Sequence, residues 1–251
     1  MRLFTCVLAV AVTTLVSGCA TVPTDPEDRA EYEALNDPLE PTNRTVMDFN
    51  LALDDAVLRP VARGYRSGLP DEVQHGIHNV LNNLRSPLIF ANDTLQGSPN
   101  RAGDTLIRFM INSTMGVFGI FDVVGDTGGP RYHGEDFGQT LAVWGVGEGP
   151  YLVLPFFGPS NPRDTVGLGV EFLADPADLA LVNQSLEWAV WTRTGVGVGD
   201  ERAELLDPID DLKRNSLDFY AAVRSIYRQR RANEIANRDM KASDLYKKES
   251  H

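Results

Sequence analysis

A cysteine that directly follows a short apolar N-terminal segment has the clearest chemistry in this sequence. Arg2 gives a positively charged start, an apolar stretch runs from Leu3 to Val16, and two small residues then precede Cys19. These are the features of a signal peptide that ends before the cysteine. A thiol at this place can form the thioether to diacylglycerol that lipoprotein processing requires. We therefore expect residues 1–18 to be removed and Cys19 to carry the lipid.

The residues after this cysteine also indicate in which membrane the lipoprotein is anchored. Ala20 and Thr21 follow Cys19, and neither is the Asp that commonly retains such lipoproteins at the inner membrane. This favours the outer membrane, with the protein facing the periplasm. The apolar stretch is too short to be a membrane-spanning helix. The alternative is an ordinary secretory signal followed by an incidental cysteine.

The other reactive side chains form no recognisable catalytic pattern. His75 and His78 lie three residues apart on a predicted helix, as a partial metal pair would. No third ligand stands at a recognisable spacing, so a solvated helix face explains them better. His133 lies near Glu135 and Asp136, which suits acid–base work, but no nucleophile accompanies them. We expect no enzyme activity, no metal and no cofactor.

A glycine-rich run stands late in the chain. It reads Gly195-Val196-Gly197-Val198-Gly199 and lacks the preceding strand and the remaining features of a dinucleotide-binding loop. Three glycines in five residues leave the backbone many conformations. The run therefore predicts a flexible turn between two helical segments.

Charge and cysteine content exclude several function classes. Without Arg2, 22 basic and 35 acidic residues remain, a formal charge of −13. Such a chain does not bind nucleic acid or an anionic membrane surface through bulk charge. Membrane attachment must come from acyl chains and apolar surface. Cys6 leaves with the signal peptide, so the folded part has neither a free thiol nor a disulfide.

Apolar residues recur every three or four positions along most of the chain, which predicts a mainly α fold. We expect a polar tether over residues 19–36, one folded domain over 37–232, and a polar, disordered tail over 233–251. The predicted helices cover Asn43–Leu58, which ends or bends at Arg59-Pro60; a segment from Pro70 that breaks or kinks at Ser86-Pro87; a segment from Ser98-Pro99; Leu179–Trp191; and Leu205–Ile226. Strands should be few.

Two apolar segments stand apart from these helices. Residues 116–124 read GVFGIFDVV and residues 151–158 read YLVLPFFG. Both are too short to span a bilayer. From the residues alone, core packing is favoured over an interfacial lipid layer.

Four long motifs, in order, resemble one family. They read DPLEPTNRTVMDFNLALDDAVLRP at 37–60, FANDTLQGSPNRAGDTLIRFMINSTMGVFGIFDVVGDT at 90–127, DFGQTLAVWGVGEGPYLVLPFFGPSNPRD at 136–164 and, more thinly, LLDPIDDLKRNSLDFYAAVRSIYRQR at 205–230. Together they closely resemble the MlaA (VacJ) family of outer-membrane lipoproteins. The match covers about residues 35–230 and is weakest between Leu173 and Arg202.

This resemblance implies phospholipid transport. The family is a compact, ring-like bundle of amphipathic helices with short Gly/Pro-rich connections around an amphipathic channel, embedded in the inner leaflet of the outer membrane. Phospholipids misplaced in the outer leaflet enter it and pass to a soluble periplasmic carrier, and trimeric porins are partners. The alternative is a structural, porin-associated envelope lipoprotein that passes no lipid.

The resemblance also assigns candidate residues. It turns the two apolar segments into lipid-facing surface rather than core. The membrane- or lipid-facing candidates are Phe118, Ile120, Phe121, Leu152, Phe156 and Phe157. The channel or gate candidates are Phe49, Asn50, Gly195, Gly197 and Gly199.

Overall fold

The computed structural model describes residue 25 and residues 35–237, and there the predicted mainly α fold is confirmed. The predicted signal peptide, Cys19 and most of the predicted tether lie outside the described residues. The helical elements are α3 (Glu40–Leu53), the π-helix η1 (Asp54–Leu58), α4 (Arg59–Gly68), α5 (Asp71–Leu95), α6 (Pro99–Thr114), α7 (Val123–Asp126), α8 (Phe137–Val143), α9 (Pro162–Ala174), α10 (Pro176–Asn183), α11 (Glu187–Glu204), α12 (Leu206–Asn215) and α13 (Phe219–Ile235). Strands β1 (Leu152–Leu154) and β2 (Gly158–Ser160) form one antiparallel hairpin.

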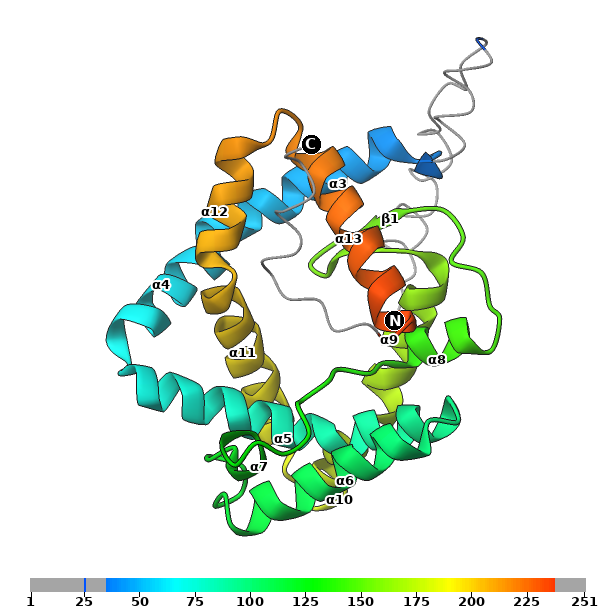
Figure 1. Ribbon diagram of the computed structural model, residues 1–251. Coiled ribbons are helices and arrows are strands. Elements are labelled where there is room, and N and C mark those ends of the chain that lie inside the picture. Colours follow the sequence, from blue (N-terminus) through cyan, green and yellow to red (C-terminus); the bar gives the residue numbers. More distant parts are fainter. Residues whose placement is uncertain (1–24, 26–34, 238–251) are drawn as a thin grey trace.

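The helices are arranged around a ring (Figure 1). From α3 the chain passes through α4 to the long helix α5, against which α6 packs, while α11 contacts both α4 and α5. The last helix, α13, returns to the first. An ion pair joins Arg44 to Asp218 at 2.6 Å, and another joins Arg224 to the buried Asp37 at 2.7 Å. These pairs close the ring between the two ends of the described chain.

Prolines mark several helix starts, as the sequence predicts. Pro70 is the N-cap of α5, and α6 begins at Pro99 after the N-cap Ser98. Proline suits a first turn because its missing N–H would have no partner inside the helix there. Ser98 stands at the N-cap position, as the Ser98-Pro99 pair predicts, but its side chain makes no capping hydrogen bond.

Two other prolines do not end the helical path. Before Pro60 the chain takes up η1, a π-helical segment whose wider turn continues directly into α4. Pro87 lies inside α5, so of the two outcomes expected here, a break or a kink, the break is wrong. Leu88 and Ile89 directly after it are buried. Their packing holds the helix through a residue that cannot donate a backbone hydrogen bond.

The predicted helical segment from Leu205 to Ile226 is split in two. α12 ends at Asn215, and Asp218 then caps α13 by accepting a hydrogen bond from the backbone N–H of Ala221 at 3.2 Å. The boundary predicted between domain and tail, at 232–233, falls inside α13, which ends at Ile235. Residues from 238 onward lie outside the described chain.

Polar side chains fill much of the interior. Within the described residues, more of the buried side chains are polar or charged than hydrophobic, and the hydrophobic clusters are small. Arg202 contacts the buried Asp54 at 2.6 Å, and Arg231 contacts Asp164 at 2.8 Å and Asp136 at 2.5 Å. Many large apolar side chains lie instead at the surface, with Phe118 80% exposed and Leu173 79% exposed. Among residues 25 and 35–237, no helix is both long and apolar enough to cross a membrane.

Candidate functional site

The long helix α5 presents a polar face to a small pocket. The pocket has a volume of about 220 Å³. Its lining residues are His78, Asn79, Asn82, Asn83, Ser86, Arg108, Asn112, Asp122 and Tyr132. The first five follow helical spacing on α5 and therefore share one side of it. Asparagine amides both donate and accept hydrogen bonds, so this pocket offers both kinds of partner to a polar group.

The charged residues of this pocket are paired with each other. Arg108 donates to Asp122 at 2.8 Å and to the carbonyl of Pro130 at 2.6 Å, and Asn112 donates to Asp122 at 2.8 Å. Burial raises the pKa of Asp122, but the hydrogen bonds from Arg108 and Asn112 outweigh it and hold this pKa below its ordinary value. Asp122 is therefore ionised at neutral pH and balances the guanidinium. The pocket is polar without a net charge from this pair.

Another side of α5 lines an apolar groove. The groove has a volume of about 650 Å³ and lies between α5, α11 and the loop before α7. Its lining residues are Glu72, Val73, Gly76, Ile77, Val80, Leu81, Leu84, Ile120, Phe121, Thr192, Arg193 and Val196. Most are aliphatic or aromatic, so the groove offers burial to a hydrocarbon chain.

The loop over residues 115–121 joins these two sites. Asn79, from the polar pocket, donates to the carbonyl of Ile120 at 3.1 Å, while the Ile120 side chain lines the groove. Gly119 has φ +89° and lies so close to Asn83 that a Cβ atom would clash. Ile120, Phe121 and Phe118 are 42%, 58% and 80% exposed, as lipid-facing side chains would be. Their contact with lipid stays a prediction.

A second apolar projection is the hairpin tip. Phe156 and Phe157 are 67% and 61% exposed. Leu152, the other lipid-facing candidate of this segment, is half-buried. Phe49 of α3 meets Phe156 edge to face, with ring centroids 5.5 Å apart. The structure thus brings a predicted channel residue and a predicted lipid-facing residue together.

Two asparagines of α3 hold this hairpin. Asn50 donates to the carbonyl of Leu154 at 2.9 Å and accepts from the N–H of Phe156 at 2.8 Å. Asn43 does the same one step earlier, with Tyr151 at 3.0 Å and the N–H of Val153 at 2.9 Å. Seven residues of helix rise by about 10 Å, as do three residues of strand, so the spacings match. Asn50, predicted as a channel residue, therefore positions the hairpin, and Asn43 is the partner that the sequence did not reveal.

The glycine-rich run is helical, so the predicted flexible turn is wrong. Gly195, Gly197 and Gly199 all lie inside α11. Each glycine costs a helix about 1 kcal/mol relative to alanine. Ion pairs on both sides of the run offset this: Arg193 contacts Asp175 at 3.0 Å and Asp178 at 2.5 Å, and Arg202 contacts Asp54 at 2.6 Å. Ion pairs therefore hold α11 on both sides of the glycines, while the helix itself is least stable over residues 195–199.

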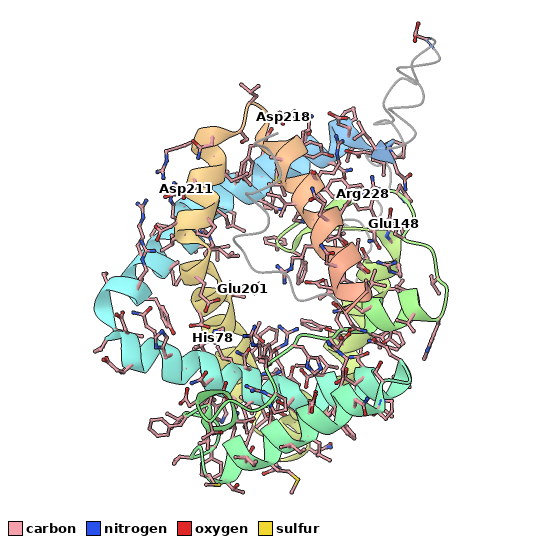
Figure 2. The ribbon with its side chains drawn as sticks, in the orientation of Figure 1. His78, Glu148, Glu201, Asp211, Asp218 and Arg228 are labelled. Atoms are coloured by element: carbon pink, nitrogen blue, oxygen red, sulfur yellow. The ribbon has the colours of Figure 1, made fainter. Side chains whose placement is uncertain are left out.

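The solvated helix face expected for two histidines fits one of them and not the other. His75 is exposed, whereas His78 of α5 (Figure 2) is only partly exposed. Its Nδ1 lies 2.9 Å from Asp200 of α11. His133 lies 3.0 Å from Asp93 and 3.3 Å from Thr105 in a largely buried polar network. Asp136 caps α8 by accepting from the N–H of Gln139.

Two further pairs of apolar side chains are exposed, and the sequence reasoning missed only the first of them. Phe172 and Leu173 end α9, with exposed fractions of 67% and 79%. Trp188 and Trp191 on α11 are 67% and 69% exposed. The signal for the first pair was the apolar end of a helix in the region where the family resemblance is weakest.

Comparison with known proteins gives a consistent result. The family model described as MlaA lipoprotein matches residues 35–234. The intermembrane phospholipid transport system lipoprotein MlaA of Escherichia coli (strain K12) is 38% identical over 226 residues, covering 87% of this chain and 83% of that protein. The protein of the same name from Haemophilus influenzae is 31% identical over 235 residues, covering 91% and 89%.

A solved structure agrees with the sequence relatives. It comes from work described as "Structural basis for maintenance of bacterial outer membrane lipid asymmetry" and superposes with a TM-score of 0.68 at 37% identity. The similarity covers 79% of this chain and 98% of the solved one.

Proposed function

The chain belongs to the MlaA lipoprotein family, and we propose that it is the outer-membrane lipoprotein of an intermembrane phospholipid transport system. In this role it removes mislocalised phospholipids from the outer leaflet through an amphipathic channel and passes them to a soluble periplasmic carrier. The result is retrograde transport that maintains lipid asymmetry.

The two faces of α5 are the observation that carries this proposal. A phospholipid has a charged head group, which is costly to strip of water without polar partners, and apolar tails, which are costly to expose. The polar pocket offers amide and hydroxyl groups, and the groove offers an apolar wall. Ile120, held by Asn79, lies at the junction of the two. A lipid moving along α5 could keep both of its parts in suitable surroundings.

The surface supports seating in the inner leaflet of the membrane. Contiguous exposed apolar side chains are uncommon on proteins surrounded by water. Here they include the 115–121 loop, the hairpin tip and two tryptophans of α11, and tryptophan favours the membrane interface. We place these groups in the lipid layer, with acyl chains on Cys19 as the second attachment. A trimeric porin would shield part of this surface.

The anchor has its own test. Cys19→Ser should block lipidation and leave an uncleaved or mislocalised precursor, because the thioether needs the thiol. Mass spectrometry of the wild-type N-terminus gives the direct readout. An unmodified Cys19 there would refute the anchor but would leave the two faces of α5 unaffected.

A transfer assay tests passage of lipid. Vesicles that carry the protein and a labelled phospholipid are mixed with the soluble carrier, and the label gained by the carrier is measured. Leu81→Asp places a charge in the groove and should slow transfer strongly. Phe90→Asp is the matched control, because Phe90 lies on the same helix, is 38% exposed and does not line the groove. Both variants are first checked for wild-type helix content.

The same assay separates transport from a structural role. A porin-associated scaffold that passes no lipid would give no protein-dependent transfer even in the wild type. Equal transfer by wild type and Leu81→Asp would instead mean that lipid does not use this groove. The glycine-rich part of α11 remains our candidate gate, since Val196 lines the groove and the helix is weakest there.

A further inference from the structure

Three side chains with metal-binding chemistry lie close together, one on α5 and two on α11. The Nδ1 atom of His78 lies 2.9 Å from an oxygen of Asp200 and 3.2 Å from an oxygen of Glu204. The three ligand atoms all lie within 4.8 Å of one another. Asp200 and Glu204 are one turn apart on α11, so both carboxylates leave the helix on the same side.

A further contact orients the buried carboxylate. Tyr65 of α4 donates from its hydroxyl to Oδ1 of Asp200 at 2.8 Å, while Oδ2 faces His78. A hydrogen bond to the outer oxygen of a ligating carboxylate is the usual way in which proteins fix such a ligand. Among the described residues, no lysine or arginine forms an ion pair with Asp200 or Glu204. No ammonium or guanidinium group of the described chain therefore occupies the place that a cation would take between these carboxylates.

We propose that His78, Asp200 and Glu204 bind one divalent cation with the ligand preferences of zinc. One imidazole nitrogen and two carboxylate oxygens are ligands that zinc accepts in tetrahedral sites, with a water in the fourth position. Bond lengths near 2 Å place neighbouring tetrahedral ligands about 3.3 Å apart. The 2.9 and 3.2 Å separations need only small adjustments. The side chains of His78 and Glu204 are 37% and 58% exposed, which leaves a route for the ion and the water.

A second cluster of possible metal ligands already contains a positively charged side chain. Asp93, His133 and Glu135 also gather their ligand atoms within 4.8 Å. There, however, Arg101 contacts Glu135 at 2.7 Å and lies 3.6 Å from Asp93, so a guanidinium already supplies the positive charge. The proposal therefore concerns only the His78 cluster. A cation there would join α11 to α5 and, through Tyr65, to α4.

Calorimetric titration with zinc chloride tests the site on the full lipidated chain in detergent. We expect one saturable zinc per chain. His78→Ala and Glu204→Gln should weaken binding by about 100-fold or more, since loss of an outer partner alone costs about 10- to 100-fold. Tyr65→Phe, which removes such an outer partner, should cost about 10-fold. Zinc should raise Tm in the wild type and in neither ligand variant.

Two of the other three histidines provide matched controls. His75→Ala removes an exposed imidazole one turn away on the same helix, and His251→Ala removes one outside the described residues. Both should bind zinc as the wild type does. Glu204 is exposed, so Glu204→Gln tests the ligand without disturbing the interior. No saturable binding at millimolar zinc, or equal losses in His75→Ala and His78→Ala, would overturn the proposal, and neither result bears on lipid transfer.

Discussion

Replacing Asn50 with alanine should release the hairpin tip from α3. The Asn50 amide makes two hydrogen bonds to the strand backbone, at 2.9 and 2.8 Å. Each is worth about 0.5–1.5 kcal/mol, so the loss is about 1–3 kcal/mol. Phe156 has φ +70°, a conformation that L residues keep only when their surroundings enforce it. Without the two hydrogen bonds of Asn50, the backbone at Phe156 should relax toward negative φ.

Hydrogen exchange is the assay, because the loss is local. The amide of Phe156 donates only to Asn50 in the described structure, so its exchange should become at least about tenfold faster in Asn50→Ala. Denaturant unfolding of the same variant gives the global part of the loss. Asp48→Ala, an exposed neighbour on α3, is the matched control and should change neither quantity.

A comparison with Asn43 makes the reasoning refutable. Asn43 is buried and also donates to Asp37 at 2.8 Å, so Asn43→Ala should cost more than Asn50→Ala in global stability. If exchange at Phe156 is unchanged in Asn50→Ala and its stability equals that of the control, the amide does not hold the hairpin. The rings of Phe49 and Phe156 would then have to do so.

Three further predictions follow from burial and backbone geometry. Replacing the three glycines of α11 with alanine should stabilise the protein by about 1 kcal/mol or more, since nothing lies closer than 3.9 Å to an added Cβ, and should slow lipid transfer if α11 must bend. Burial raises the pKa of Glu171 from its ordinary value of 4.5 to about 7, so the stability of the wild type should fall as the pH rises from 4.5 to about 7. In thermal melts, Glu171→Gln should be about 2–3 kcal/mol more stable than the wild type at pH 8 and equally stable at pH 4. Phe118→Asp should weaken vesicle binding measured by co-flotation, because charge is costly in an apolar layer, while Val146→Asp should not.

The sequence predicted elements whose signals are local. Pro70 and Pro99 mark helix starts because a missing N–H is harmless in a first turn. The apolar spacing along α5 indicated a helix, and the helix is there. The exposed positions of Phe118 and Phe156 were predicted through the family resemblance, since apolar residues alone favoured core.

Long-range contacts explain what the sequence did not predict. The glycines of α11 have a local preference for turns, but ion pairs of Arg193 and Arg202 to other elements hold them in a helix. His78 showed no third ligand because its partner, Asp200, lies 122 residues away. No local pattern indicated that Asn43 and Asn50 hold the hairpin, because the carbonyl groups that they contact lie 108 and 104 residues away.

The helix α11 is held by ion pairs on both sides of a glycine-rich run, and this arrangement connects the groove with the His78 cluster. Salt bridges hold Arg193 and Arg202 on either side of the glycines, and Val196 lines the groove between them. A bend confined to residues 195–199 would change the width of the groove without breaking either ion pair. The His78 cluster lies at the C-terminal end of the glycine-rich run, since Asp200 follows Gly199 directly. A cation there would limit the bend, so zinc should slow lipid transfer in the wild type and leave it unchanged in Glu204→Gln.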